Sequence, residues 1–207
     1  MLGLFFVTFL VGQVLAGRHE YNDEREKNGE PPVSHVEYLR SSHFVEATAE
    51  NWESEFLQMF VYIVATAYLF QIGSAESRDP RKTEEEREKE APKISPDSPG
   101  PVKAGGWRLK IYEHSLSLAF ATLFLIAFVL HMLGGHRLYN EERARDSEPA
   151  VELSEYAGSS RFWFESFQNW QSEFLAIGSM VILSIWLRER NSPESKSVQT
   201  PHWENEE

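Results

Sequence analysis

Charged residues make up 25% of this 207-residue chain, yet four long stretches contain no Asp, Glu, Lys or Arg. These stretches are residues 1–16, 56–72, 116–133 and 174–187. A soluble protein would instead spread its apolar residues along the chain at the period of a helix or strand. A helix needs about 17–25 apolar residues to cross a bilayer. The second and third stretches meet this length, and the fourth does when it extends back through the aromatic residues 162–167. This segregation predicts an all-α integral membrane protein with four transmembrane helices.

The N-terminal stretch has a second interpretation, as a secretory signal peptide. It is apolar, and the small residues Val14 and Ala16 precede a potential cleavage site. It lacks the basic residues that usually precede the apolar core of a signal peptide. We favour a retained helix, because the internal repeat described next matches this stretch to a later membrane segment. The sequence leaves open whether residues 1–16 are retained or whether the start is truncated.

An internal repeat relates the two halves of the chain. Residues 11–77 align without a gap on residues 129–195 when the sequence is shifted by 118 positions. GRHEYNDERE then falls on GHRLYNEERA, and NWESEFL falls on NWQSEFL. Such self-similarity indicates a duplicated structural unit. We predict two tandem helix–loop–helix repeats, with repeat 1 at residues 1–78 (loop 17–55) and repeat 2 at residues 107–196 (loop 134–173).

The segment between the repeats, residues 79–106, is rich in Pro, Gly and charges of both signs, so we predict a disordered linker. A charged tail, residues 197–207, follows repeat 2. Residues 73–115 hold nine Lys and Arg, whereas each loop holds four. Because positive charge gathers on the cytoplasmic side, we predict a cytoplasmic linker, cytoplasmic termini and two extracytoplasmic loops. Two spans per repeat give both repeats the same orientation, with a pseudo-twofold axis along the membrane normal.

The loops carry signals for short helices of their own. Ser34 and Glu37 have the spacing of a capping box. Serine pairs that can cap the helices entering the membrane stand at Ser41-Ser42 and Ser159-Ser160. Trp52 and Trp170 fall where these helices reach the lipid, so we predict that they are interfacial anchors.

The repeated motif NWxSEFL places Asn51 and Glu55 on one helical face, and Asn169 and Glu173 on another. One interpretation is a shared cation or proton site made by these four residues near the outer membrane boundary, where an ionisable group usually needs a partner. The other, which we favour, is that each Glu fixes how its loop meets its helix. Residues that carry a fold recur in a duplication for that reason alone.

Arginine and histidine residues complete the set of candidate polar groups. Arg25 and Arg143 follow the first helix of each repeat, where they either form ion pairs with Glu55 and Glu173 or are simply solvated, since most exposed pairs contribute only about 0–1 kcal/mol. None of the seven histidines belongs to a His-x-x-x-His or Glu-x-x-His pattern. His131 could serve as an axial haem ligand, but we predict an interfacial histidine bonded to a carbonyl, because its repeat counterpart is Gln13.

Composition and motifs exclude several classes of function. The chain has no cysteine, which excludes disulfides and thiolate metal sites. Its net charge of −12 argues against nucleic acid as a partner, because phosphate binding needs clustered Lys and Arg. No glycine-rich phosphate loop, GxSxG motif or nucleophile–base pair is recognisable. We therefore predict no enzymatic activity, no cofactor and no metal.

The combined pattern YNEER, EYAGSSRFWFESFQNWQSEFL and SIWLRERNSPESK, with YEHSLSLAF before the third apolar stretch, resembles a family of small bacterial inner-membrane proteins of unknown function. The resemblance covers nearly the whole chain and is most specific at residues 112–196. It implies a duplicated protein of the bacterial inner membrane. It implies no activity, so it assigns no catalytic or binding residue.

Taken together, the sequence predicts a non-catalytic structural or interaction protein, or an accessory subunit of a membrane complex. The alternative is a small transporter or channel with a cation or proton site at the repeated Asn/Glu pairs. The expected partners are the lipid bilayer and either a second copy of the chain or another membrane protein. The sequence names neither the substrate nor the partner.

Overall fold

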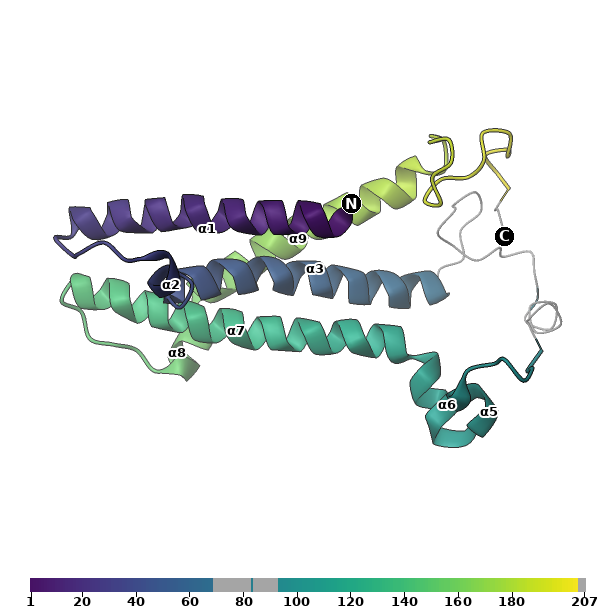
Figure 1. Ribbon diagram of the computed structural model, residues 1–207, viewed down its shortest axis with the longest axis horizontal. Coiled ribbons are helices and arrows are strands. Elements are labelled where there is room, and N and C mark those ends of the chain that lie inside the picture. The colour runs from purple at the N-terminus through teal and green to yellow at the C-terminus, as the bar shows by residue number, and fades with distance from the viewer. Residues whose placement is uncertain (69–82, 84–92, 205–207) are drawn as a thin grey trace. The chain divides into compact units, whose positions relative to one another are not determined.

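The computed structural model describes residues 1–68, 83 and 93–204, and all of its regular secondary structure is helical (Figure 1). The helices are α1 (Leu2–Lys27), α2 (His35–Tyr38), α3 (Ser42–Tyr68), α5 (Gly100–Ala104), α6 (Gly106–Glu113), α7 (Ser115–Arg145), α8 (Leu153–Ala157) and α9 (Ser160–Leu183). The predicted all-helical class is confirmed for these residues. The predicted linker lies partly outside the described residues. Its last residues form α5, so the prediction of disorder is wrong there.

The described chain divides into two compact units. Unit 1 comprises residues 1–54 and 124–169, and unit 2 comprises residues 55–123 and 170–207. Each of the long helices α3, α7 and α9 therefore contributes residues to both units. Unit 1 contains both loops of the predicted repeats and most of the buried side chains.

In unit 1, a tyrosine from each short loop helix lies in the core. Tyr38 of α2 and Tyr156 of α8 are each only 1% exposed. A Cβ added to Gly17 would lie 2.1 Å from the Tyr38 hydroxyl, and one added to Gly135 would lie 2.2 Å from the Tyr156 hydroxyl. Each tyrosine thus fits against a long helix at a position where only glycine leaves room.

The two loops of unit 1 are held by the same side-chain bonds at positions 118 apart. The Asn22 side chain accepts from the amide of Val33 at 2.8 Å and donates to its carbonyl at 3.2 Å. Asn140 makes the same pair of bonds with Val151, at 2.9 and 3.2 Å. One asparagine side chain thus satisfies both the N–H and the C=O of a loop residue, as a neighbouring strand would, and holds the irregular loop in place.

The arginines of the two loops also bond locally. Arg25 donates to the Pro31 carbonyl at 2.8 Å and pairs with Glu30 at 2.7 Å. In the second loop, Arg143 donates to the Pro149 carbonyl at 2.7 Å and pairs with Glu148 at 2.8 Å. The predicted ion pairs of Arg25 and Arg143 with Glu55 and Glu173, which belong to unit 2, stay a prediction. A carbonyl and a carboxylate within the same loop already occupy each guanidinium.

The predicted helix caps are confirmed. Ser34 and Glu37 form the reciprocal capping box at the start of α2. Ser41 accepts from the amide of Phe44 at 3.2 Å, and Ser159 accepts from the amide of Phe162 at 3.3 Å. These bonds satisfy amides that the first turn of a helix leaves without partners.

Replacing Asn140 with Ala is expected to destabilise the folded protein by about 1–3 kcal/mol, because in a part-buried loop the Val151 amide loses its partner and the Val151 carbonyl keeps one of its two bonds, that to His136. Asn28→Ala is the matched control, since the Asn28 side chain is exposed and donates only to the Glu24 carbonyl. Thermal unfolding in detergent, followed by circular dichroism, measures both. Equal midpoints for the two variants would contradict the anchoring role of Asn140.

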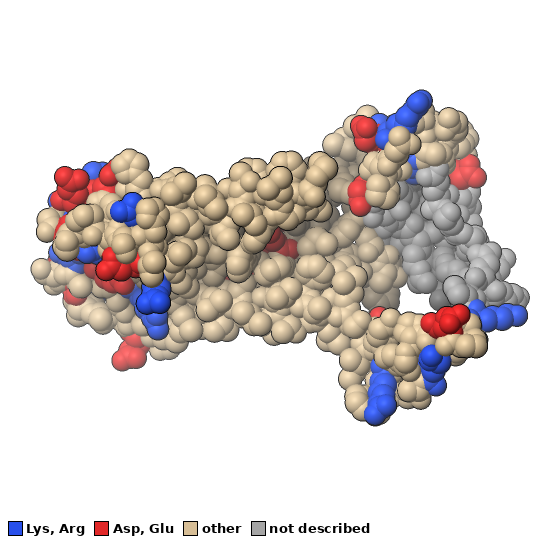
Figure 2. Space-filling model, in the orientation of Figure 1, with Lys and Arg blue, Asp and Glu red and all other residues tan. Residues whose placement is uncertain are grey.

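Among the described residues, two helices are long and apolar enough to cross a membrane, namely α1 and α7. Figure 2 shows the charged residues of unit 1 gathered at one end, over the loops that follow α1 and α7, and an uncharged surface over the N-terminal part of α1. Helices α3 and α9 contain only part of the predicted spans 56–72 and 174–187. Helix α9 ends at Leu183, and residues 69–72 lie outside the described residues.

Unit 2 holds fewer buried side chains. Within it, the Gln58 side chain donates to the Glu173 carbonyl at 3.1 Å, which joins α3 to α9. Lys196 is 1% exposed and donates to three carbonyls of the following segment, those of Pro201, His202 and Glu204. These bonds satisfy all three protons of its ammonium group.

Candidate functional site

Helix α3 directs a row of three carboxylates into unit 1. Glu46, Glu50 and Glu53 are spaced at i, i+4 and i+7, which puts them on one helical face. Glu46 is 9% exposed and Glu53 is fully buried. Helix α3 comes very close to α7 here, because a Cβ on Gly134 would lie 2.9 Å from the backbone nitrogen of Glu46. Glycine on α7 therefore allows the acidic face of α3 to approach His131, one turn earlier on α7.

His131 is fully buried and lies between two carboxylates. Its Nδ1 donates to Oε2 of Glu53 at 2.7 Å. Its Nε2 lies 3.7 Å from Oε2 of Glu165, which is too long for a hydrogen bond. Within the part of the chain that the structure describes, Nε2 has no hydrogen-bond partner. A buried ring nitrogen without a partner is costly, so this atom marks a place where a further group is expected.

Glu165 of α9 is held in place by its neighbours. Arg161 donates to Oε1 of Glu165 at 3.0 Å, and the same guanidinium binds both carboxylate oxygens of Glu142 on α7. The Tyr156 hydroxyl lies 3.5 Å from Oε2 of Glu165. Burial raises the pKa of Tyr156, so its hydroxyl keeps its proton at physiological pH and remains a donor. Glu165 is thus oriented from two sides toward His131.

We call Glu46, Glu53, His131 and Glu165 the histidine–glutamate cluster. One potential ligand atom from each of Glu46, His131 and Glu165 lies within 4.8 Å of the others. Glu50 lies beside the cluster and accepts a hydrogen bond from Asn169. A neutral imidazole nitrogen together with carboxylate oxygens is a donor set that suits Zn, Mn or Fe ions.

The electrostatics of the cluster follow from burial and from excess negative charge. Burial raises the pKa of Glu46 to about 7, and the neighbouring carboxylates of Glu50 and Glu165 add to this effect against the opposing influence of His131 and Arg161. Burial also acts to raise the pKa of Glu165, but the nearby His131 and the Arg161 guanidinium that donates to this carboxylate outweigh it, and the pKa is lowered. A carboxylate next to Arg161 is thus charged, whereas Glu46 holds a proton more readily.

Replacing Glu46 with Gln is expected to change the pH dependence of stability. Burial raises the pKa of Glu46 in the folded state from its ordinary 4.5 to about 7, so between these values the folded state retains a proton that the unfolded state has lost. Stability from this group therefore falls as pH rises from about 4.5 to 7. In a buffer with chelator, Glu46→Gln should match the wild type near pH 4.5 and exceed it above pH 7, by at most about 3 kcal/mol. Unfolding midpoints that run parallel across this range would contradict the burial of a titrating Glu46.

The two asparagines predicted from NWxSEFL differ in their contacts within unit 1. Asn51 is exposed and donates to the Ala47 carbonyl of its own helix, whereas Asn169 donates to Glu50. Both asparagines belong to unit 1, and Glu55 and Glu173 belong to unit 2. Neither unit by itself therefore contains the predicted four-residue site.

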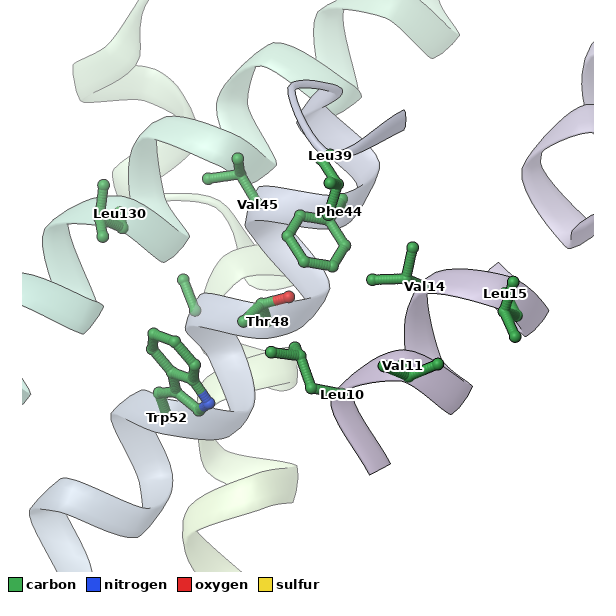
Figure 3. Close-up of a pocket in the computed structure, with 11 residues that line it drawn as sticks. Leu10, Val11, Val14, Leu15, Leu39, Phe44, Val45, Thr48, Trp52 and Leu130 are labelled. Atoms are coloured by element: carbon green, nitrogen blue, oxygen red, sulfur yellow. The ribbon is translucent and has the colours of Figure 1, made fainter. Parts of the chain in front are cut away.

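The predicted interfacial tryptophans differ in exposure, and Trp52 lines an apolar pocket. Trp52 is 38% exposed, and Trp170 is partly buried. The pocket, of about 580 Å³, lies within unit 1 between α1 and α3 (Figure 3). Leu10 and Val14 of α1 point into it toward Phe44 of α3. Its almost wholly apolar lining suits contact with hydrocarbon, as expected of a residue near lipid.

The cluster was not predicted from the sequence, neither the partner of His131 nor the acidic row on α3. The prediction that His131 bonds to a carbonyl is wrong, because its partner is the carboxylate of Glu53. The row of Glu46, Glu50 and Glu53 has a spacing that could have been read as one acidic face. Nothing in the sequence, however, joins that face to a histidine 78 positions later or to Glu165 on a third helix.

Comparison with known proteins places the chain in a family. No curated protein and no solved structure matched the chain. A family described as "Domain of unknown function (DUF6766)" matches residues 1–207. The match covers the whole chain, including both predicted repeats and the histidine–glutamate cluster. The chain belongs to the DUF6766 family, whose members share a domain of unknown function.

Proposed function

We propose that this chain is a non-catalytic, multi-pass membrane protein that binds a cation at the histidine–glutamate cluster. The sequence suggested the repeated Asn/Glu pairs as a cation site; we assign the cation site to the cluster instead. The observation that carries the proposal is the fully buried His131, held between Glu53 and Glu165 with one ring nitrogen unpartnered among the described residues.

The membrane part of the proposal extends the two candidate spans α1 and α7 to four. The uncharged stretches 56–72 and 174–187 would supply the other two, with the loops outside and the linker and termini in the cytoplasm of a bacterial inner membrane. The apolar pocket that Trp52 lines, and the uncharged surface over the N-terminal part of α1, support contact with lipid. A second copy of the chain or another membrane protein would be the further partner.

A duplicated helix–loop–helix framework is the second element of the proposal. The loop bonds of Asn22 and Asn140, the ion pairs of Arg25 and Arg143, and the glycine–tyrosine contacts all recur 118 positions apart. Contacts that recur in this way support a shared scaffold. They explain why the fold-bearing residues appear twice in the sequence.

The histidine–glutamate cluster, in contrast, occurs only once. The positions that correspond to its members under the same shift hold Gln13 for His131, Ala47 for Glu165, Phe164 for Glu46 and Gln171 for Glu53. A scaffold role would not require ionisable groups in one copy and neutral ones in the other. Buried ionisable groups that the scaffold does not need are candidates for function.

Charge balance explains why the bound species would be a cation. Four carboxylates, those of Glu46, Glu50, Glu53 and Glu165, lie around a single histidine, and the neighbouring Arg161 pairs with both Glu165 and Glu142. Excess negative charge is costly to bury, so the site gains stability from a positive ion that enters it. His131 lies on α7, a helix apolar enough to span a membrane. Transporters also place ionisable groups that bind ions on their membrane-spanning helices.

A cation panel tests the proposal. The unfolding midpoint of the protein in detergent is measured with Na⁺, K⁺, Mg²⁺, Ca²⁺, Mn²⁺ and Zn²⁺ chlorides against choline chloride of equal ionic strength. At least one ion should raise the midpoint saturably, and a variant with both His131→Gln and Glu165→Gln should lose the increase. If no cation acts beyond the choline control, the proposed function is wrong.

A further inference from the structure

We propose that the cation is a divalent transition-metal ion of the zinc, manganese or iron type, bound by Nε2 of His131 and by one carboxylate oxygen each from Glu46 and Glu165. This inference rests on the proposed cation-binding function and adds the class of ion and its ligands. Each ligand comes from a different helix, α7, α3 and α9 respectively.

The orientation of His131 is that of a metal ligand. Its Nδ1 hydrogen-bonds to the buried carboxylate of Glu53, and Nε2, once a metal ion displaces its proton, presents a lone pair toward Glu165 and Glu46. A histidine that binds a metal usually donates its other ring proton to a carboxylate or carbonyl, which fixes the ring and its tautomer. Glu53 is therefore the positioning residue of the site rather than a ligand.

The spacing of the three ligand atoms fits one ion. Metal–ligand bonds of about 2.0–2.2 Å place two ligand atoms at most about 4.4 Å apart. Nε2 of His131 and Oε2 of Glu165 are already 3.7 Å apart, and all three ligand atoms lie within 4.8 Å of one another. Small rotations of the carboxylates are enough to close the shell, and a fourth position remains for water or another ligand.

The two segments of unit 1, residues 1–54 (the first half) and 124–169 (the second half), differ in one polar contact. In the first half, Gln13 donates to the Thr48 hydroxyl at 3.0 Å. The same shift of 118 positions turns this pair into His131 and Ser166. Nε2 of His131 and Oγ of Ser166 are both buried, and among the described residues neither has a hydrogen-bond partner. The hydrogen bond between Gln13 and Thr48 is thus replaced by two buried polar atoms, Nε2 of His131 and Oγ of Ser166, that do not bond to each other. Such atoms are expected at a site that binds an ion.

The donor set selects the class of ion. Mg²⁺ and Ca²⁺ prefer oxygen ligands, whereas an imidazole nitrogen favours transition metals. The chain has no cysteine, so soft thiolate-dependent binding of Cu(I) is excluded. One histidine with two carboxylates suits Zn²⁺, Mn²⁺ and Fe²⁺. Which of these ions binds then depends on how much of each is available in the cell.

The test is a titration of chelator-treated protein in detergent with Co²⁺, Zn²⁺, Mn²⁺ and Mg²⁺, followed by calorimetry and, for Co²⁺, by its visible absorption. We expect one transition-metal ion per chain, no comparable Mg²⁺ binding, and proton release with affinity that falls as pH falls. His131→Gln, Glu46→Gln and Glu165→Gln should each lose at least about 100-fold in affinity, and Glu53→Gln about 10–100-fold. The exposed residues His19 and Glu155 provide matched controls, His19→Gln and Glu155→Gln, which should leave the affinity unchanged.

The outcomes separate this inference from the function on which it rests. His131→Gln is expected to fold, because Gln13 occupies the equivalent position in the first half and bonds to Thr48. Circular dichroism and gel filtration check this. Binding of Mg²⁺, Ca²⁺ or Na⁺ alone, with stabilisation, would overturn the transition-metal assignment and keep the cation function. Transition-metal binding that survives His131→Gln would overturn the assignment of ligands. Absence of any cation effect would overturn both.

Discussion

Replacing His131 with Leu is expected to destabilise the metal-free protein by about 3–5 kcal/mol, because the fully buried carboxylate of Glu53 loses its hydrogen bond from His131. Loss of packing around Phe162, whose ring lies 5.0 Å from that of His131, adds a smaller contribution. Chemical unfolding in detergent, with chelator present, measures the difference in unfolding free energy.

The double variant His131→Leu with Glu53→Leu is the control that isolates this cause. Removing both partners replaces a buried polar pair by apolar side chains, which is often neutral or stabilising. We therefore expect the double variant to regain most of the stability lost by the single variant while it fails to bind a metal. If the double variant were as unstable as the single one, the cost would arise from packing rather than from the buried carboxylate.

Replacing Gly134 with Ala is the second change expected to have a large effect. The added Cβ would lie 2.9 Å from the backbone nitrogen and 3.1 Å from the Cα of Glu46. Backbone atoms of a packed helix cannot move aside as a side chain can, so α3 and α7 must separate locally within unit 1. Overpacking of this kind costs about 1–3 kcal/mol or more.

The same change should weaken metal binding, since it moves Glu46 away from His131 without altering any ligand. Metal titration and thermal unfolding of the variant measure the two effects together. Gly178→Ala is the matched control, because nothing lies within 4 Å of a Cβ at Gly178 on α9. Metal affinity and stability of Gly134→Ala equal to those of this control would contradict the close approach of the two helices.

Much of the local structure could be predicted from sequence, because its determinants are short-range. The capping box of Ser34 and Glu37 and the serine caps of α3 and α9 depend on residues three positions apart. The uncharged stretches predict the apolar parts of the long helices, whereas α1 and α7 continue through charged residues that were predicted as loop, to Lys27 and Arg145. The partners of Arg25 and Arg143 were missed because a carbonyl and a carboxylate five or six residues away compete with the more distant glutamates.

The candidate site could not be predicted, because it depends on contacts across three helices. The acidic row on α3 has a visible spacing, but its meaning depends on which face α7 covers and on the glycine that lets the helices approach. The internal repeat also favours residues present twice, such as those of NWxSEFL, as candidates for a site. The cluster is formed by residues present once, and these become informative only when the scaffold contacts around them are seen to recur.

Native mass spectrometry of the protein, extracted gently from its own membranes without chelator, tests the central claim most directly. The account predicts a mass increase equal to one transition-metal ion per chain, confirmed by elemental analysis, that is absent from the His131→Gln variant and present in His19→Gln. A metal-free mass for the wild type, under conditions that retain bound lipid and partner subunits, would contradict the proposal that the histidine–glutamate cluster is a metal site.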